Sequence, residues 1–361
     1  MGRSLHRAVA HAGVGATARL IGLLLGVSRW AAVVVLSAAA LACDGCTAPS
    51  STARGGLSDH REVRVEVDSG VTLAGDFAWP LASATTPVPA ILLLSGSGAQ
   101  DRDGTRIELP GYRPFADVAD TLLAAGFAVL RLDDRGVGAS TGRFDGTTTE
   151  DFARDAAAAV AWLRAQSRVQ PERIALVGHS EGALVALLVA RADPQLWALG
   201  LLGAAARSGR EIARWQRATL VATDLTTWAP AQRAAVLARA ESDADAIAAT
   251  DPWLRTWFSL DPRTIARDVR QPALLLHGEN DRQVAVEQVH ELAAVLHNAR
   301  AMRLSHTNHL LLDDFDGDPR GYVRLTSRRI DGGILRVLVT FLQQQNGENR
   351  FSEGKTAKQI R

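Results

Sequence analysis

The stretch IALVGHSEGALVALL, residues 174–188, decides how the chain is organised. An apolar run of the kind found in a buried strand leads into Gly178 and Ser180, and a helical pattern follows Gly182. Glycines on both sides of a serine let the backbone turn sharply between a strand and a helix without side-chain clashes. The N-terminus of that helix offers amide donors to developing negative charge. We therefore interpret Ser180 as a candidate nucleophile.

Short apolar runs and amphipathic helical patterns alternate on both sides of this turn. The runs are AILLL (90–94), FAVLRL (127–132), LWALGLL (196–202) and PALLLHG (272–278). This alternation predicts an α/β fold, in which helices cover both faces of a mostly parallel central sheet. Two strand-like runs at 62–67 and 71–80, joined by a turn with glycine, predict an antiparallel hairpin before the alternating pattern begins.

The alternation stops after about residue 206. Residues 207–268 are helix-like, contain four tryptophans and show no clear strand. We expect this block to be a helical cap inserted in a domain that covers residues 61–345, with most of its tryptophans packing its interior. The α/β pattern then resumes with a helix expected over 284–298 and a final helix near 321–344.

A serine nucleophile needs a base, and the base needs an orienting carboxylate. On a strand–turn–helix serine site of this kind, the chain order is serine, acid, histidine. Asp281 lies in the turn after PALLLHG and is the preferred acid, with Glu279 as the alternative. Downstream, after the strand-like run ARAMRLS, the chain offers two histidines, His306 and His309.

From about residue 62 to 344 the chain resembles the α/β-hydrolase superfamily, in particular bacterial serine esterases related to dienelactone hydrolases and prolyl oligopeptidases. The resemblance rests on SGSGAQDRDG, RLDDRGVGAS, GHSEG, WFSLDPRTIARDVRQPALLLHGENDRQV and TNHLLL. It implies a histidine within an Asn-His-Leu triplet, which selects His309 over His306. It also implies a serine hydrolase acting on small carboxylic esters without a cofactor. Peptidases, thioesterases, acyltransferases and non-catalytic binding proteins on the same fold are the alternatives.

Two backbone N–H groups are needed to stabilise the oxyanion. Glu181, directly after the nucleophile, supplies one, and the loop after AILLL supplies the other, from Ser97 or, as second choice, Gly98. Relatives often have histidine where this chain has Ser95, so we expect different hydrogen bonds behind the loop. Asp134 in RLDDRGVGAS is interpreted as a structural residue.

The charge balance argues against nucleic-acid binding, and the spacing of possible ligands argues against a metal site. The 40 basic and 39 acidic residues leave a net charge of +1, which gives no overall field for a polyanion. The segment DDFDGDP resembles the start of a calcium loop, but Pro319 replaces the required glycine and Leu325 the bidentate glutamate. His306 and His309 lack an evident third ligand for zinc.

The two ends of the chain differ in composition from the rest. Residues 1–43 hold several arginines and no acidic residue, and they end in AAVVVLSAAALAC, which is typical of an export signal. ALAC resembles a lipobox, so lipidation of Cys43 and simple secretion are both left open, with an uncleaved anchor as a third reading. Residues 44–60 are expected to be a flexible linker and 346–361 a disordered tail. These features predict an exported protein in the cell envelope or outside the cell.

Overall fold

The computed structural model of the protein describes residues 58–80 and 86–346. The predicted export signal, Cys43 and residues 347–361 lie outside this part of the chain. Strand β1 (Ser58–Asp68) begins inside the segment 44–60 expected to be a linker, because Ser58 already pairs with Pro80 on the neighbouring strand. The linker prediction therefore extended a few residues too far.

The described residues form an eight-stranded sheet in the order β1-β2-β4-β3-β5-β6-β7-β8. The hairpin of β1 and β2 is antiparallel, and β2 also runs antiparallel to β4, whereas the pairs from β4 to β8 are parallel. The remaining strands are β2 (Val71–Pro80), β3 (Val88–Leu94), β4 (Ala128–Leu132), β5 (Val169–His179), β6 (Ala198–Leu202), β7 (Ala273–Gly278) and β8 (Ala299–Leu304). The predicted α/β class with a mostly parallel sheet is confirmed.

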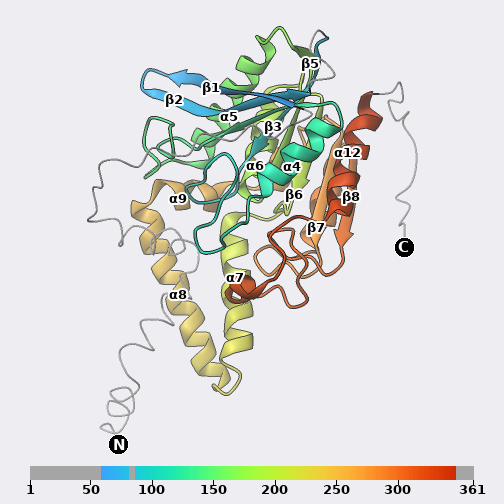
Figure 1. Ribbon diagram of the computed structural model, residues 1–361. Coiled ribbons are helices and arrows are strands. Elements are labelled where there is room, and N and C mark those ends of the chain that lie inside the picture. Colours follow the sequence, from blue (N-terminus) through green and yellow to red (C-terminus); the bar gives the residue numbers. More distant parts are fainter. Residues whose placement is uncertain (1–57, 81–85, 347–361) are drawn as a thin grey trace, which may run out of the picture.

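Helices pack on both faces of the sheet (Figure 1). Leu176 and Val177, neighbours on β5, are both fully buried but belong to different hydrophobic clusters, one on each face. A strand buried on both faces reads as a continuous apolar run, which explains the sequence pattern. One face carries α4 (Pro114–Ala124) and α12 (Gly332–Asn346), and the other carries α5 (Thr149–Arg164), α6 (Glu181–Ala192), α10 (Pro262–Ala266) and α11 (Gln288–Ala293).

Helices alone connect β6 to β7. They are α7 (Gly209–Asp224), α8 (Pro230–Thr250), α9 (Pro252–Ser259) and α10. In Figure 1, α7 and α8 extend side by side away from the sheet, and α9 returns toward it. Trp253 and Trp257 of α9 stack with ring centroids 5.4 Å apart, whereas Trp228 at the α7–α8 turn is 39% exposed. None of the helices in the described part of the chain is long and apolar enough to cross a membrane.

The C-terminal helices are shorter than the sequence pattern predicted. In place of one helix near 321–344, the structure has a 3₁₀ helix η2 (Pro319–Arg324) and then α12, which starts at Gly332. In the same way, α11 covers only Gln288–Ala293 of the expected 284–298. Apolar residues that suggested one long helix include Tyr322 of η2, which belongs to a separate small cluster with Leu310 and Leu312.

Candidate active site

The turn that carries Ser180 is confined by close backbone approaches. Ser180 has φ 55° and ψ −117°, a backbone conformation that residues other than glycine seldom adopt. A Cβ on Gly178 would lie 2.2 Å from the carbonyl oxygen of Gly182, and a Cβ on Gly182 would lie 2.2 Å from that of Leu94. Neither contact can be relieved by moving a side chain. Both glycines are therefore required for β3, β5 and α6 to meet at this point.

The structure brings His309 and Asp281 together with Ser180. Nε2 of His309 lies 3.0 Å from Ser180 Oγ, and Nδ1 of His309 lies 2.6 Å from Asp281 Oδ2. His309 is 3% exposed and Asp281 5% exposed. The three side chains follow β5, β7 and β8, whose carboxyl ends share one edge of the sheet. In this arrangement the hydroxyl can donate to Nε2 while Nδ1–H donates to the carboxylate.

Asp281 is held as an ionised acceptor. Its Oδ1 accepts hydrogen bonds from the backbone N–H groups of Gln283 and Val284, each at 2.8 Å. Its Oδ2 also lies 3.2 Å from Nε2 of the buried His277. Burial by itself would raise the pKa of Asp281, but the His309 and His277 rings outweigh it and hold the pKa well below its usual value.

The alternative acid and the alternative histidine lie away from Ser180. The exposed Glu279 faces Arg303 at 3.8 Å. His306 is exposed, has φ 52° and packs its ring 4.6 Å from that of Phe315. The structure therefore brings Asp281 and His309, and not Glu279 or His306, to the serine.

Asn308 shapes the loop that presents His309. It is fully buried, and its Oδ1 accepts hydrogen bonds from the backbone N–H groups of Leu310, at 2.9 Å, and Leu312, at 3.1 Å. Its Nδ2 donates to Asp314 Oδ2 at 3.0 Å. These bonds close a tight turn around the histidine, which gives a physical reason for asparagine in the Asn-His-Leu triplet.

The loop after β3 passes directly beside Ser180. A Cβ on Gly96 would lie 3.2 Å from the Cβ of Ser180, and the exposed Ser97 follows it. Behind the loop, Ser95 Oγ donates to Asp134 Oδ1 at 2.9 Å, and Gln100 N–H donates to Asp134 Oδ2 at 3.0 Å. Burial raises the pKa of Asp134 to about 7. Asp134 is thus a structural support for this loop.

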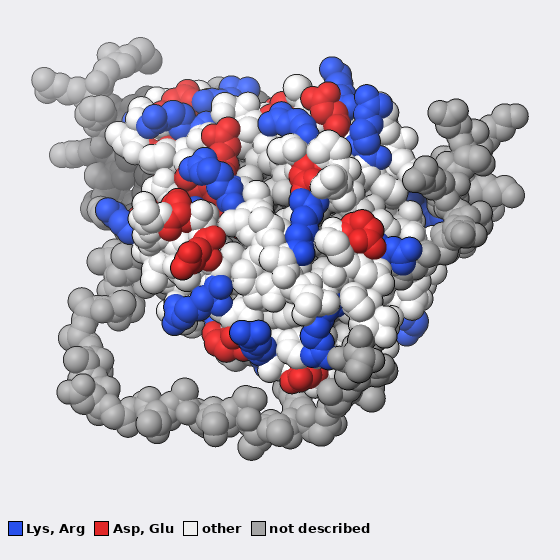
Figure 2. Space-filling model, turned by 90° about the horizontal axis from the view of Figure 1, so that it is seen from above, with Lys and Arg blue, Asp and Glu red and all other residues white. Residues whose placement is uncertain are grey.

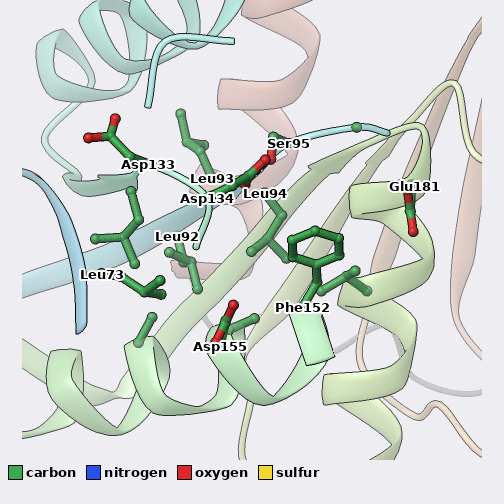
Figure 3. A pocket seen from close by; sticks show the side chains of 15 residues that line it. Leu73, Leu92, Leu93, Leu94, Ser95, Asp133, Asp134, Phe152, Asp155 and Glu181 are labelled. Atoms are coloured by element: carbon green, nitrogen blue, oxygen red, sulfur yellow. Dashed lines mark hydrogen bonds between the residues drawn. The ribbon is translucent and has the colours of Figure 1, made fainter. Parts of the chain in front are cut away.

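Glu181 opens α6 and is 5% exposed. Its Oε1 accepts hydrogen bonds from Thr149 Oγ1 at 2.6 Å and from Trp253 Nε1 at 2.8 Å. Burial raises the pKa of this carboxyl, and the Thr149, Trp253 and Ser97 side chains oppose the shift only in part. Figure 3 shows Glu181 beside a small cavity, about 50 Å³, that Asp134 also lines. Sequence reasoning missed Thr149 and Trp253 as partners of the site.

On the face seen in Figure 2, acidic and basic side chains are interspersed. Within residues 58–80 and 86–346, no group of three or more histidine, cysteine, aspartate or glutamate side chains is arranged to hold a metal ion.

A family profile described as X-Pro dipeptidyl-peptidase (S15 family) matches residues 69–249, half of the 361-residue chain. The chain belongs to this family. The match includes Ser180 and the loop after β3, and it ends before Asp281 and His309. Two uncharacterized proteins of Mycobacterium tuberculosis, from strains CDC 1551 / Oshkosh and ATCC 25618 / H37Rv, are each 36% identical over 146 residues, 40% of this chain. That match spans 46% of each, so the chain covers about half the length of these relatives.

Solved structures similar to this S15-family chain share its fold at low sequence identity. The Pyrococcus furiosus esterase Pf2001 superposes with a TM-score of 0.54 at 16% identity, covering 80% of this chain and 91% of the esterase. Est1E from Butyrivibrio proteoclasticus, solved with ferulic acid, superposes with a TM-score of 0.53 at 17% identity. The match covers 79% of this chain and 99% of Est1E. These likenesses confirm the α/β-hydrolase fold.

Proposed function

We propose that this protein is a serine hydrolase that cleaves carboxylic esters through an acyl-enzyme intermediate. The observation that carries the proposal is the chain of contacts from Ser180 Oγ to His309 Nε2, at 3.0 Å, and from His309 Nδ1 to Asp281 Oδ2, at 2.6 Å. A nucleophile, a base and a buried carboxylate in this order are the parts that acyl transfer needs.

In the proposed reaction, Ser180 Oγ attacks the acyl carbonyl while His309 Nε2 takes its proton. Asp281 keeps Nδ1 protonated and stabilises the imidazolium cation. The backbone amides of Glu181 and Ser97 bind the oxyanion of the tetrahedral intermediate. His309 then gives its proton to the leaving alcohol. Water, deprotonated by the same nitrogen, then attacks the acyl-enzyme. As the second tetrahedral intermediate collapses and the acid is released, His309 returns this proton to Ser180 Oγ.

A dipeptidyl-peptidase is the second candidate, and the family membership favours it. The esterases among the similar structures favour an ester substrate, as does the general likeness to serine esterases. Both reactions use the same serine, histidine and aspartate. The preference between ester and amide therefore has to come from substrate profiles.

The first experiment compares wild type with Ser180→Ala on p-nitrophenyl acetate, p-nitrophenyl butyrate and an Xaa-Pro p-nitroanilide. We expect the substitution to lower kcat by at least about 10³-fold on the preferred substrate, since only binding and oxyanion contacts remain. A fluorophosphonate probe should label wild type and not the variant. Unchanged hydrolysis by Ser180→Ala would overturn the assignment, and faster turnover of the anilide than of both esters would favour the peptidase.

We also propose that the protein is exported and acts in the envelope or outside the cell, on the basis of the arginine-containing apolar N-terminus. Mass spectrometry of the mature N-terminus separates the alternatives. A diacylglyceryl group on Cys43 supports a lipid anchor, cleavage without lipid supports secretion, and an intact Met1 in the cytoplasmic fraction contradicts export.

A further inference from the structure

Glu181 has two separable parts in the proposed active site. Its backbone N–H is the candidate first oxyanion donor, whereas its side chain is buried against neighbouring elements. A carboxyl removed from water needs hydrogen-bond donors, or it destabilises the fold. The identity of its donors therefore indicates what the side chain holds together.

The carboxyl of Glu181 connects three segments that are far apart in the sequence. Thr149, the first residue of α5, donates to Oε1 at 2.6 Å, and Trp253 of α9 donates to the same oxygen at 2.8 Å. The first turn of α6 also packs directly against the loop after β3, since a Cβ on Gly182 would lie 2.4 Å from the carbonyl oxygen of Ser95. The Glu181 side chain thus joins the inserted helix α9 and helix α5 to the turn of α6 that contacts this loop.

The donor on α9 is fixed by packing. The Trp253 ring lies nearly parallel to that of Trp257, at an interplanar angle of 8° and a centroid distance of 5.4 Å. Trp257 in turn covers the start of α7, where a Cβ on Gly209 would lie 2.2 Å from its ring. A shift of α7 against α9 would therefore move the indole N–H that Glu181 accepts.

The second oxygen of Glu181 indicates that packing alone does not account for an acid here. Oε2 is buried without a hydrogen-bond partner, and Glu181 lines the small cavity that Figure 3 shows together with Asp134 and Asp155. An unpaired buried oxygen is destabilising, and an apolar side chain would avoid that penalty. A bridging role for Oε1 gives a reason for the glutamate.

Resting on the proposed function, we propose that Glu181 is a positioning residue that couples helix α9 to the oxyanion hole. The Trp253–Glu181 hydrogen bond sets the orientation of the first turn of α6 and, through the close packing of Gly182 against the Ser95 carbonyl, of the loop that carries the second amide. The two amides lie in line with the oxyanion only when α9 is seated. The inserted helices thereby control the acylation rate of Ser180.

The test compares Trp253→Phe, which keeps an aromatic ring but removes the donor, with Trp228→Phe at the exposed α7–α8 turn. We expect Trp253→Phe to lower kcat on p-nitrophenyl butyrate about tenfold with KM within about twofold, because misaligned donors weaken only the transition state. The rate of fluorophosphonate labelling should fall in parallel. Trp228→Phe should leave all three quantities within about twofold of wild type. Equal kcat for the two variants overturns the coupling.

Glu181 variants separate positioning from simple loss of structure. Glu181→Gln retains an Oε1 acceptor for Thr149 and Trp253 and should keep kcat within about threefold, whereas Glu181→Ala should lose about tenfold or more. Adding Trp253→Phe to Glu181→Ala should cost nothing further, since the interaction is already absent. Independent, multiplying losses contradict the coupling. If Glu181→Ala does not fold, the kcat values of Glu181→Gln and Trp253→Phe still test the coupling between α9 and the oxyanion hole.

Failure of this inference is distinguishable from failure of the proposed function. Activity that survives in Ser180→Ala overturns the serine mechanism itself. Activity that is lost in Ser180→Ala but unchanged in Trp253→Phe leaves the mechanism standing and overturns only the role of Glu181.

Discussion

The ring of His179 donates a hydrogen bond from Nε2 to the main-chain oxygen of His309 at 2.8 Å. The ring centroids of His179 and His309 lie 5.0 Å apart, and His179 is 9% exposed. Burial and the neighbouring His309 lower the pKa of His179 to about 3, so its ring is neutral at physiological pH. A neutral ring that donates from Nε2 fixes one tautomer. His179, directly before the proposed nucleophile, thereby anchors the backbone of His309, the proposed base.

Replacing His179 by leucine should weaken this anchor. We expect His179→Leu to lower kcat about tenfold with little change in KM, because the His309 carbonyl loses its buried donor and the imidazole can shift. Steady-state kinetics on p-nitrophenyl butyrate measure both constants. His179→Gln, which can still donate a hydrogen bond, is the matched variant. Equal kcat for the leucine and glutamine variants would show that the bond is irrelevant to catalysis.

The two histidines of the C-terminal loop should behave very differently. His309→Ala removes the base and should lower kcat by at least about 10³-fold. His306→Ala should keep most activity, because that ring is exposed and contacts Phe315. Kinetics on the same ester, with circular dichroism as a folding control, check the pair. The reverse ranking would transfer the role of base to His306.

The two candidate acids allow a similar comparison. Asp281→Asn keeps the shape of the side chain but removes the charge that stabilises the imidazolium, and we expect kcat to fall about 10³- to 10⁴-fold. Glu279→Gln, at an exposed position 3.8 Å from Arg303, should change kcat by less than about twofold. Fluorophosphonate labelling rates give an independent measurement. A larger loss in Glu279→Gln than in Asp281→Asn would reverse the assignment.

Asp134 should give the stability of the protein a measurable pH dependence. Burial raises its pKa from 3.8 to about 7 in the folded state, so the folded state binds the extra proton. This contribution to stability is complete below about pH 3.8 and is lost as the pH rises through about 7. Asp134→Asn lacks this pH-dependent contribution, because an amide side chain does not titrate. The free energy of unfolding of wild type, relative to Asp134→Asn, should therefore be smaller at pH 8 than at pH 5.

Urea unfolding at the two pH values measures this difference. Asp145→Asn, at an exposed position, is the control and should show the same pH dependence as wild type. A constant difference between wild type and Asp134→Asn across this pH range would contradict a raised pKa for Asp134.

The sequence was informative wherever the cause of a structural feature is local. Gly178 and Gly182 mark the turn because a Cβ at either position would collide with neighbouring backbone. The apolar runs mark the inner strands because both sides of each strand are buried. Chain order then placed Asp281 after the serine, in the turn after β7. Helix lengths were predicted less well, as in α11 and α12, because periodic apolar residues also occur in packed irregular segments.

Contacts between distant segments could be decided only by the tertiary structure. His306 and His309 are three residues apart, and the Asn-His-Leu resemblance favoured His309, but only the packing of the loop after β8 brings it to Ser180. The bonds from Thr149 and Trp253 to Glu181 span 32 and 72 residues, and the His179–His309 bond spans 130. No local pattern encodes such pairs, because their geometry depends on how whole helices and strands pack. The sequence by itself thus determined the strand–turn–helix at Ser180 and the α/β frame, and tertiary packing decided which side chains meet there.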